Sequence, residues 1–256
     1  MRAFILFIFT SLAFAAPASA QADKDTGPIR ILFIGNSYTS FNNLPAIVQS
    51  LATAAKEKRA FEFEMVTPGG CTWQRHFDDE RIDSVKKIKE KRWDYIVLQE
   101  QSQMPFMYPK DAHKYGVLLG KLAQEHGAVP LIYMTWAREK EPEKQSKITE
   151  TYLKVADELK APCAPAGTAW EVARKERPAL KLYNKDGSHP SPSGSFLTAC
   201  VFYATIYDRS PQGLTGKHLW KNEGKTYLLC DVPDVEAGFL EKVAWEAVKA
   251  EKERKK

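Results

Sequence analysis

The sequence predicts an α/β fold, a three-layer α/β/α sandwich in which helices cover both faces of a central parallel sheet. Short apolar runs alternate along the chain with stretches whose apolar residues recur at helical spacing, which is the pattern of such a sheet. The chain has 256 residues, enough to bury one sizeable core. No internal repeat and no Gly- or Ser-rich linker divides it. We therefore expect a single domain.

Three strands are expected in the first part of the chain. The apolar run Ile29 to Ile34 is the first, and Phe61 to Val66 is the second. Tyr95 to Leu98 is short and continuously apolar, as a central strand of a parallel sheet should be. A helix should follow the first strand, because Asn43 can cap it and Pro45 suits its first turn. Its buried stripe consists of Leu44, Ile47, Val48 and Leu51.

Helices and strands continue to alternate in the second part. Val129 to Met134 is expected to be the fourth strand and Pro162 to Ala166 a short fifth. Helical stripes precede, separate and follow these strands. The first is Tyr115, Leu118, Leu119 and Leu122, ended by Gly127; the second is Ile148, Tyr152, Val155, Ala156 and Leu159; the third is Phe196, Ala199, Cys200, Tyr203 and Tyr207. Residues 138–147 should be a loop into a helix, and residues 211–231 give no clear pattern.

Residues 1–20 have the features of a signal peptide. Arg2 is followed by a largely apolar run, and Ala18-Ser19-Ala20 is a small-residue cleavage site. The run is short for a membrane span, although an uncleaved anchor is the alternative. We expect residues 21–256 to form one secreted or periplasmic domain without a stable membrane anchor, ending in a charged helix or tail at residues 251–256.

Charge and cysteine content exclude several classes of protein. The net charge is +5, and the basic residues are spread along the chain without the aromatic-interleaved patch typical of nucleic-acid binding. The four cysteines form no C-x-x-C pair, which disfavours a zinc ribbon or a thioredoxin site. One or two disulfides are compatible with export, but the spacing indicates no pairing. Cys200 lies on an apolar helical stripe and should be core.

Ser37 is the first residue that points to chemistry. It lies three residues beyond the first strand, at the sheet edge where ligands of such folds bind, and just before a helix. A serine hydroxyl there can act as a nucleophile once a base removes its proton. The alternative is that residues 37–40 are ordinary turn and cap residues.

Asp186 and His189 could supply that base. Gly187 and Pro190 favour a loop around them, just ahead of a helical stretch. In a loop, Asp186 can accept the Nδ1 proton of His189, which leaves Nε2 free for the Ser37 hydroxyl. The chain order of Ser, Asp and His is the order found in many hydrolases.

With these segments the chain resembles the SGNH (GDSL-like) hydrolases. Gly35-Asn36-Ser37 corresponds to the G-D-S block of that superfamily, and Asp186 with His189 to its D-x-x-H block. The resemblance implies a flavodoxin-like sheet, with Ser37 as nucleophile, His189 as general base and Asp186 as the acid that orients it. Gly69-Gly70 resembles the block that supplies an oxyanion donor, so the N–H groups of Ser37 and Gly70 are implied as donors.

The chain departs from the superfamily pattern at two places. Asn36 stands where an Asp is usual, and it is also a candidate substrate contact. The G-x-N-D block is absent, and Gln99-Glu100-Gln101-Ser102 stands in its place. A glutamine amide can donate to an oxyanion as asparagine does, but the spacing leaves open whether Gln99 or Gln101 points inward. The block resembles that of some carbohydrate acetylesterases in the superfamily, which favours sugar esters.

Other polar and aromatic residues are assigned more modest roles. His76, Asp78 and Asp79 could bind a metal, but caps and solvated charge are the simpler interpretation, so we expect no metal site. Trp73 and Trp136 follow the second and fourth strands, so they could wall the site or pack in the core or at the rim, and Trp136 is the better candidate substrate contact. The remaining histidines without a partner pattern are expected at the surface: His113, His126 and His218.

The leading hypothesis is an exported serine esterase that needs no cofactor and acts on a small-molecule or glycan ester, such as an O-acetylated carbohydrate. One alternative is a non-catalytic protein of similar fold that binds an anion such as flavin mononucleotide at the Ser37 turn. A third hypothesis is a carbohydrate-binding protein in which the change from G-x-N-D to Gln99-Glu100-Gln101-Ser102 has abolished turnover. The acyl and alcohol halves of the substrate and the oligomeric state stay open.

Overall fold

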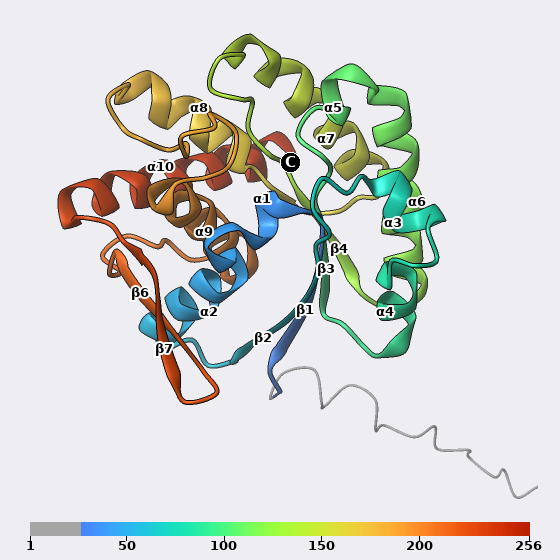
Figure 1. The fold of residues 1–256 in the computed structure, drawn as a ribbon, viewed down its shortest axis with the longest axis horizontal. Helices are drawn as coiled ribbons and strands as arrows, with labels where there is room; N and C mark the ends of the chain where they lie inside the picture. The colour runs from blue at the N-terminus through green and yellow to red at the C-terminus, as the bar shows by residue number, and fades with distance from the viewer. Residues whose placement is uncertain (1–26) are drawn as a thin grey trace, which may run out of the picture.

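A computed structural model describes residues 27–256, so the expected signal peptide lies outside the described residues. Its centre is a parallel five-stranded sheet of order β2-β1-β3-β4-β5 (Figure 1). The strands are β1 (Ile29–Ile34), β2 (Phe61–Val66), β3 (Tyr95–Leu98), β4 (Val129–Tyr133) and β5 (Cys163–Ala164). This order is that of flavodoxin-like folds. The expected fold class is confirmed, and three of the five strands have the expected bounds.

The last two strands are shorter than expected. β4 ends one residue before Met134, and β5 contains two residues of the predicted five. β5 is an edge strand that pairs with β4 only at Ile132↔Cys163 and Tyr133↔Ala164. The chain then enters a helix at Ala166, which leaves no room for a longer strand.

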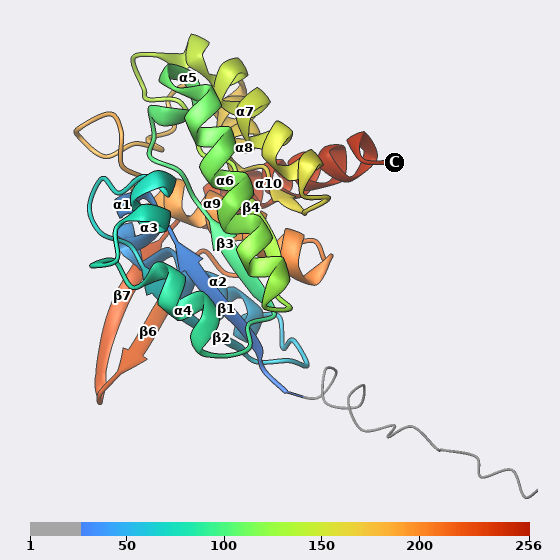
Figure 2. The same cartoon turned by 90° about the vertical axis from the view of Figure 1, so that its right-hand side faces the viewer.

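Helices cover both faces of the sheet (Figures 1 and 2). Side chains of β1 alternate between two apolar clusters, with Ile31 and Phe33 in one and Leu32 and Ile34 in the other. The first cluster is closed by α2 (Leu44–Ala54), α8 (Ala166–Glu176), α9 (Pro192–Tyr207) and α10 (Asp234–Arg254). The second is closed by α3 (Trp73–Asp78), α4 (Ser84–Glu90), α6 (Pro109–Glu125) and α7 (Gln145–Glu158).

Helix α9 is buried on nearly all sides. Every residue from Gly194 to Ala204 is buried, because the helix packs against α2, α8 and α10 as well as the sheet face. A helix that is apolar all round belongs inside a core. The helix begins three residues after His189, so the packing of α9 fixes the position of the loop that carries this residue.

The region without a clear sequence pattern contains a β-hairpin. β6 (Lys217–Asn222) and β7 (Lys225–Asp231) pair in antiparallel fashion beside the main body (Figure 1). The turn residues Glu223 and Gly224 both have positive φ, as a two-residue type I′ turn requires. The surface prediction for His218 is wrong: it is fully buried, stacks on Phe196 and bonds Ser50 at 2.9 Å through Nδ1.

The charged C-terminal run is mostly helical. Helix α10 continues to Arg254, whose guanidinium pairs with Asp157 of α7 at 2.7 Å. The expected charged helix or tail is thus helical through Arg254, and this ion pair holds the end of the helix against the body. No helix within residues 27–256 has the length and apolarity needed to cross a membrane.

Short helices complete the fold: α1 (Ser37–Ser40), η1 (Phe41–Asn43), α5 (Met104–Met107) and η2 (Pro142–Lys144). Asn43 precedes α2 as expected, but it lies in the left-handed region and its side chain caps nothing. Pro45 is in the first turn of α2, as predicted.

The four cysteines are buried free thiols, so neither of the allowed disulfides is formed, and Cys200 is core.

Candidate active site

The candidate site lies where the chain leaves β1 and β3 toward opposite faces of the sheet. β1 leads to α1 and α2 on one face, whereas β3 leads to α5 and α6 on the other. Such a switch point is where open parallel sheets bind ligands. Ile34 and Leu98 are paired in the sheet, so Ser37 and Gln101, each three residues further on, lie at the same edge.

Three side chains distant in sequence meet at this edge. The Ser37 hydroxyl is 2.8 Å from Nε2 of His189, and Nδ1 of His189 is 2.5 Å from Oδ2 of Asp186. Oδ1 of Asp186 accepts the backbone N–H groups of Ser188 and His189 at 2.9 and 3.0 Å. These atoms form the hydrogen-bonded series of a Ser-His-Asp triad. Its catalytic role stays a prediction.

The Asp186 carboxyl is positioned to stay ionised. Burial alone would raise its pKa, but the hydrogen bond to His189 and the N–H groups of Ser188 and His189 bring the pKa below its ordinary value. An ionised carboxylate at Nδ1 holds the imidazole proton on that nitrogen. The other nitrogen, Nε2, can then accept the Ser37 proton.

The loop that carries His189 is braced by aromatic rings. The imidazole stacks on Phe41 at 4.2 Å between ring centroids and meets the edge of Tyr38 at 5.7 Å. Trp136 donates its indole N–H to the carbonyl of Ser188 at 3.0 Å. These contacts fix the ring that faces Ser37.

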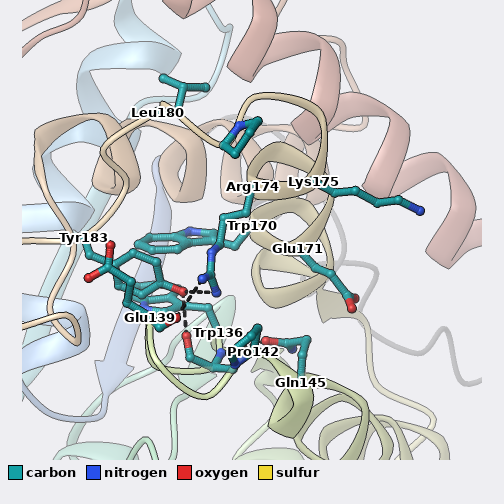
Figure 3. Close-up of a pocket in the computed structure, with 12 residues that line it drawn as sticks. Trp136, Glu139, Pro142, Gln145, Trp170, Glu171, Arg174, Lys175, Leu180 and Tyr183 are labelled. Atoms are coloured by element: carbon teal, nitrogen blue, oxygen red, sulfur yellow. Dashed lines mark hydrogen bonds between the residues drawn. The ribbon is translucent and has the colours of Figure 1, made fainter.

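A cavity of about 380 Å³ is lined by residues that include Trp136 and Trp170, and Figure 3 shows these two indoles side by side. Trp136 stacks between Tyr38 and Trp170 at 4.8 and 3.8 Å and is only 1% exposed. On the same side, Arg174 donates to Tyr183 and to the carbonyl of Glu139. The burial of Trp136 contradicts its expected contact with substrate, since nearly its whole surface packs against protein.

Two backbone N–H groups at the site have no acceptor among the described residues. The N–H of Ser37 is at the first position of α1, where a helix leaves its donors free. The N–H of Gly70 is in an exposed turn closed by a bond from Cys71 to Pro68. Gly70 has φ +62°, a conformation that favours glycine. Both groups are available to an oxyanion.

The structure distinguishes the two candidate glutamines. Gln99 is fully buried, and both donor positions of its amide are used by Oδ1 of Asn36 and the carbonyl of Glu100. Gln101 is half-buried, and among the described residues its Nε2 reaches only the hydroxyl of Ser102, at 3.5 Å, while its Oε1 accepts the N–H groups of Gln103 and Met104. Gln99 is therefore unavailable as an oxyanion donor, and Gln101 is the glutamine with a free amide nitrogen.

Asn36 has a structural role instead of the expected substrate contact. It is 2% exposed, and its Oδ1 caps α1 by accepting the N–H of Tyr38 at 3.0 Å. Its Nδ2 donates to the carbonyl of Cys71 at 3.0 Å. An amide can accept and donate at once, which an ionised Asp cannot do. This explains why a neutral residue stands before Ser37.

Glu100 was not singled out from the sequence. It is 1% exposed, and its Oε1 accepts the N–H groups of Trp73 at 2.9 Å and Gln101 at 2.6 Å. The Glu100 carboxyl thus links the segment after Gly70 to the Gln101 loop through hydrogen bonds. Burial raises the pKa of Glu100 to about 8, so the group is mostly protonated at neutral pH. An acidic residue two positions after a buried strand was the available sequence signal.

His76 is buried under the site as a neutral side chain. It contacts the carbonyl of Gly35 through Nε2 at 2.7 Å and the hydroxyl of Ser84 through Nδ1 at 2.6 Å. Burial lowers its pKa to about 4. Asp78 accepts the Tyr115 hydroxyl, and Asp79 pairs with Arg81. No cluster of three potential metal ligands occurs in the part of the chain that is described.

The other aromatic and histidine predictions have mixed outcomes. Trp73 is fully buried and meets the edge of Tyr152, so it belongs to the core and does not wall the site. His126 is exposed, as expected. His113 is half-buried and lies 3.0 Å from Glu158.

No family model matches the sequence, and no curated protein matches it. Solved structures do. A protein from Slackia heliotrinireducens assigned to the SGNH hydrolases is 26% identical, with 70% of this chain and 99% of that chain covered at a TM-score of 0.61. A DUF4886 family protein from Bacteroides uniformis is 20% identical, with 87% and 95% covered at 0.66. The acetyl xylan esterase AlAXEase is 14% identical, with 70% and 100% covered at 0.57. The resemblance found in the sequence is confirmed at the level of the fold.

Proposed function

Because the chain has the SGNH hydrolase fold, we propose that it is a serine esterase with Ser37 as nucleophile. The supporting observation is the 2.8 Å contact between the Ser37 hydroxyl and Nε2 of His189, with Asp186 on the other ring nitrogen. A serine hydroxyl needs a hydrogen-bonded general base to take its proton before it can attack an ester carbonyl.

The reaction proceeds in two halves. His189 takes the Ser37 proton as Oγ attacks the carbonyl carbon, and the negative oxygen accepts hydrogen bonds from the N–H groups of Ser37 and Gly70 and from the Gln101 amide. The C–O bond of the ester breaks, and the leaving alcohol receives the proton from His189. Water then attacks the acyl-Ser37 ester with His189 again as base, which releases the acid and restores the serine. No step requires a cofactor.

O-acetylated carbohydrate is the substrate class that we favour. The Gln101 block resembles that of carbohydrate acetylesterases, as noted above. The triad is also open to solvent, since the side chains of His189 and Asp186 are 26% and 47% exposed, so an ester attached to a large glycan could reach it. The predicted signal peptide would export the protein to a periplasm or beyond the cell, where such glycans occur.

A paired screen tests this proposal. Purified protein and its Ser37→Ala variant would be assayed against short-chain aryl esters and acetylated sugars. We expect hydrolysis by the wild type and a loss of at least about 10³-fold in kcat for Ser37→Ala. Equal rates for the two proteins would overturn the esterase proposal. Sugar binding without any hydrolysis would favour the non-catalytic alternative.

A further inference from the structure

Arg138 is a cation at the candidate site that has no acidic partner in the described part of the chain. It lies five residues beyond the end of β4 and is half-buried. Among residues 27–256, its one hydrogen bond runs from Nη2 to the Ser102 hydroxyl at 3.3 Å, and its buried Nε has no partner. A guanidinium has five N–H donors, so most of the hydrogen-bonding capacity of Arg138 is unused.

The surroundings of Arg138 connect it to all three loops of the site. Ser102 follows Gln101, and Tyr38 follows Ser37. The Tyr38 hydroxyl bonds the hydroxyl of Ser188, the residue before His189, at 2.8 Å. Burial raises the pKa of Tyr38, whereas Ser188, Ser102 and Arg138 act to lower it, so the guanidinium acts on this hydroxyl directly. Arg138 is thus adjacent to the groups that would handle the ester.

Nearby carboxyls do not neutralise this charge. The Asp186 carboxylate accepts hydrogen bonds from His189 and from the backbone of its own loop. Glu100 accepts two backbone N–H groups through Oε1 and is mostly protonated at neutral pH. A partly buried cation without a counterion is costly, and an external anion would relieve that cost.

We propose that Arg138 binds a carboxylate of the substrate, so that the protein prefers anionic esters. This deepens the proposed function and rests on it. A planar guanidinium suits a carboxylate because two parallel N–H···O bonds can form. The carboxylate could belong to the acyl half of the ester or to the alcohol half, as in an O-acetylated uronic acid.

Two matched substrate pairs test the proposal. For the alcohol half, mono-acetylated methyl glucuronide is compared with mono-acetylated methyl glucoside. For the acyl half, 4-nitrophenyl monoadipate is compared with its neutral adipamate. The variants are Arg138→Gln, Arg138→Lys and the control Arg209→Gln. Arg209 follows the far end of α9, roughly 24 Å along the helix from its start beside the His189 loop.

We expect the wild type to prefer the carboxylate member of at least one pair by its kcat/KM. In Arg138→Gln this preference should fall about tenfold, in Arg138→Lys it should fall less, and in Arg209→Gln it should persist. No carboxylate preference in either pair, or a preference that survives Arg138→Gln, would overturn the assignment.

Binding without turnover separates this proposal from the esterase proposal. If the wild type hydrolyses none of the four esters, the esterase proposal is the one that fails. Calorimetric titration of the Ser37→Ala protein with methyl glucuronide and with adipate then tests Arg138 alone. A Kd for either anion that rises about tenfold when Arg138→Gln is added supports the site, and an unchanged Kd for both overturns it.

Discussion

Asn36 and Gln99 are joined by two hydrogen bonds that run in opposite directions. The backbone N–H of Asn36 donates to Oε1 of Gln99 at 2.9 Å, and Nε2 of Gln99 donates to Oδ1 of Asn36 at 3.0 Å. The pair links the carboxyl ends of β1 and β3 directly beneath Ser37. Thr39 adds a third bond to the same Oε1. This amide network, and not a charge, positions the turn that presents the proposed nucleophile.

Restoring the usual Asp of the superfamily should therefore harm this protein. Asn36→Asp removes the donor to the carbonyl of Cys71 and places a negative charge in a site that is 2% exposed. We expect the free energy of unfolding in urea to fall by about 1–3 kcal/mol. Asn222→Asp, at the exposed last residue of β6 beside the hairpin turn, is the matched control. An Asn36→Asp protein as stable as the control would contradict the described network.

The two glutamines should respond differently to truncation. Gln101→Ala removes the free amide nitrogen and should lower kcat by about 10²–10³-fold with little change in KM, as loss of one oxyanion donor does. Gln99→Ala removes the buried bonds to Asn36 and Thr39 and should mainly lower the melting temperature. Steady-state kinetics and thermal unfolding of both variants show which glutamine acts in catalysis and which acts in stability. A catalytic defect confined to Gln99→Ala would reverse the assignment.

Asp186→Asn tests the orientation of His189. The amide keeps the size of the side chain but no longer favours the imidazole tautomer that carries a proton on Nδ1. We expect kcat to fall by about 10³–10⁴-fold while KM stays close to that of the wild type. Asp231→Asn, at an exposed hairpin carboxylate, is the control and should leave kcat unchanged. A loss smaller than tenfold in Asp186→Asn would remove Asp186 from the proposed triad.

Glu100 should make the stability of the protein depend on pH. Its pKa is about 8 in the folded protein and about 4.5 when unfolded, so the folded state binds more protons between these values. The free energy of unfolding should therefore decrease as the pH rises from 5 to 9, on the order of 4 kcal/mol in total.

The Glu100→Gln variant isolates this contribution. Its amide oxygen can still accept the N–H groups of Trp73 and Gln101, but it has no proton to lose. Urea unfolding at pH 5.5 and 8.5 should show a smaller difference for Glu100→Gln than for the wild type. The same pH dependence in both proteins would show that Glu100 does not titrate in this range.

The sequence contained enough to locate the sheet and the candidate triad. β3 and the last four residues of β1 are buried and continuously apolar, so their carboxyl ends are visible where polar residues appear. Gly187 and Pro190 indicated the loop that brings Asp186 and His189 together. These features are local, and local patterns are what a single sequence displays.

The features that were missed depend on partners far along the chain. The direction of Gln99 is set by Asn36 and Thr39, sixty or more residues earlier, and the burial of His218 is set by Ser50 and Phe196. Spacing along a strand end gives the position of a residue but not the direction of its side chain. Trp136 was misassigned for the same reason, since its stacking partners come from α1 and α8.

The most direct test of the account is the site and rate of covalent modification by a fluorophosphonate. Peptide mass spectrometry should find the adduct on Ser37 in the wild-type protein, and labelling should be at least about 10²-fold slower in His189→Ala, where the hydroxyl has lost its base. An adduct on a different serine, or an undiminished rate in His189→Ala, would contradict the claim that these two side chains act together.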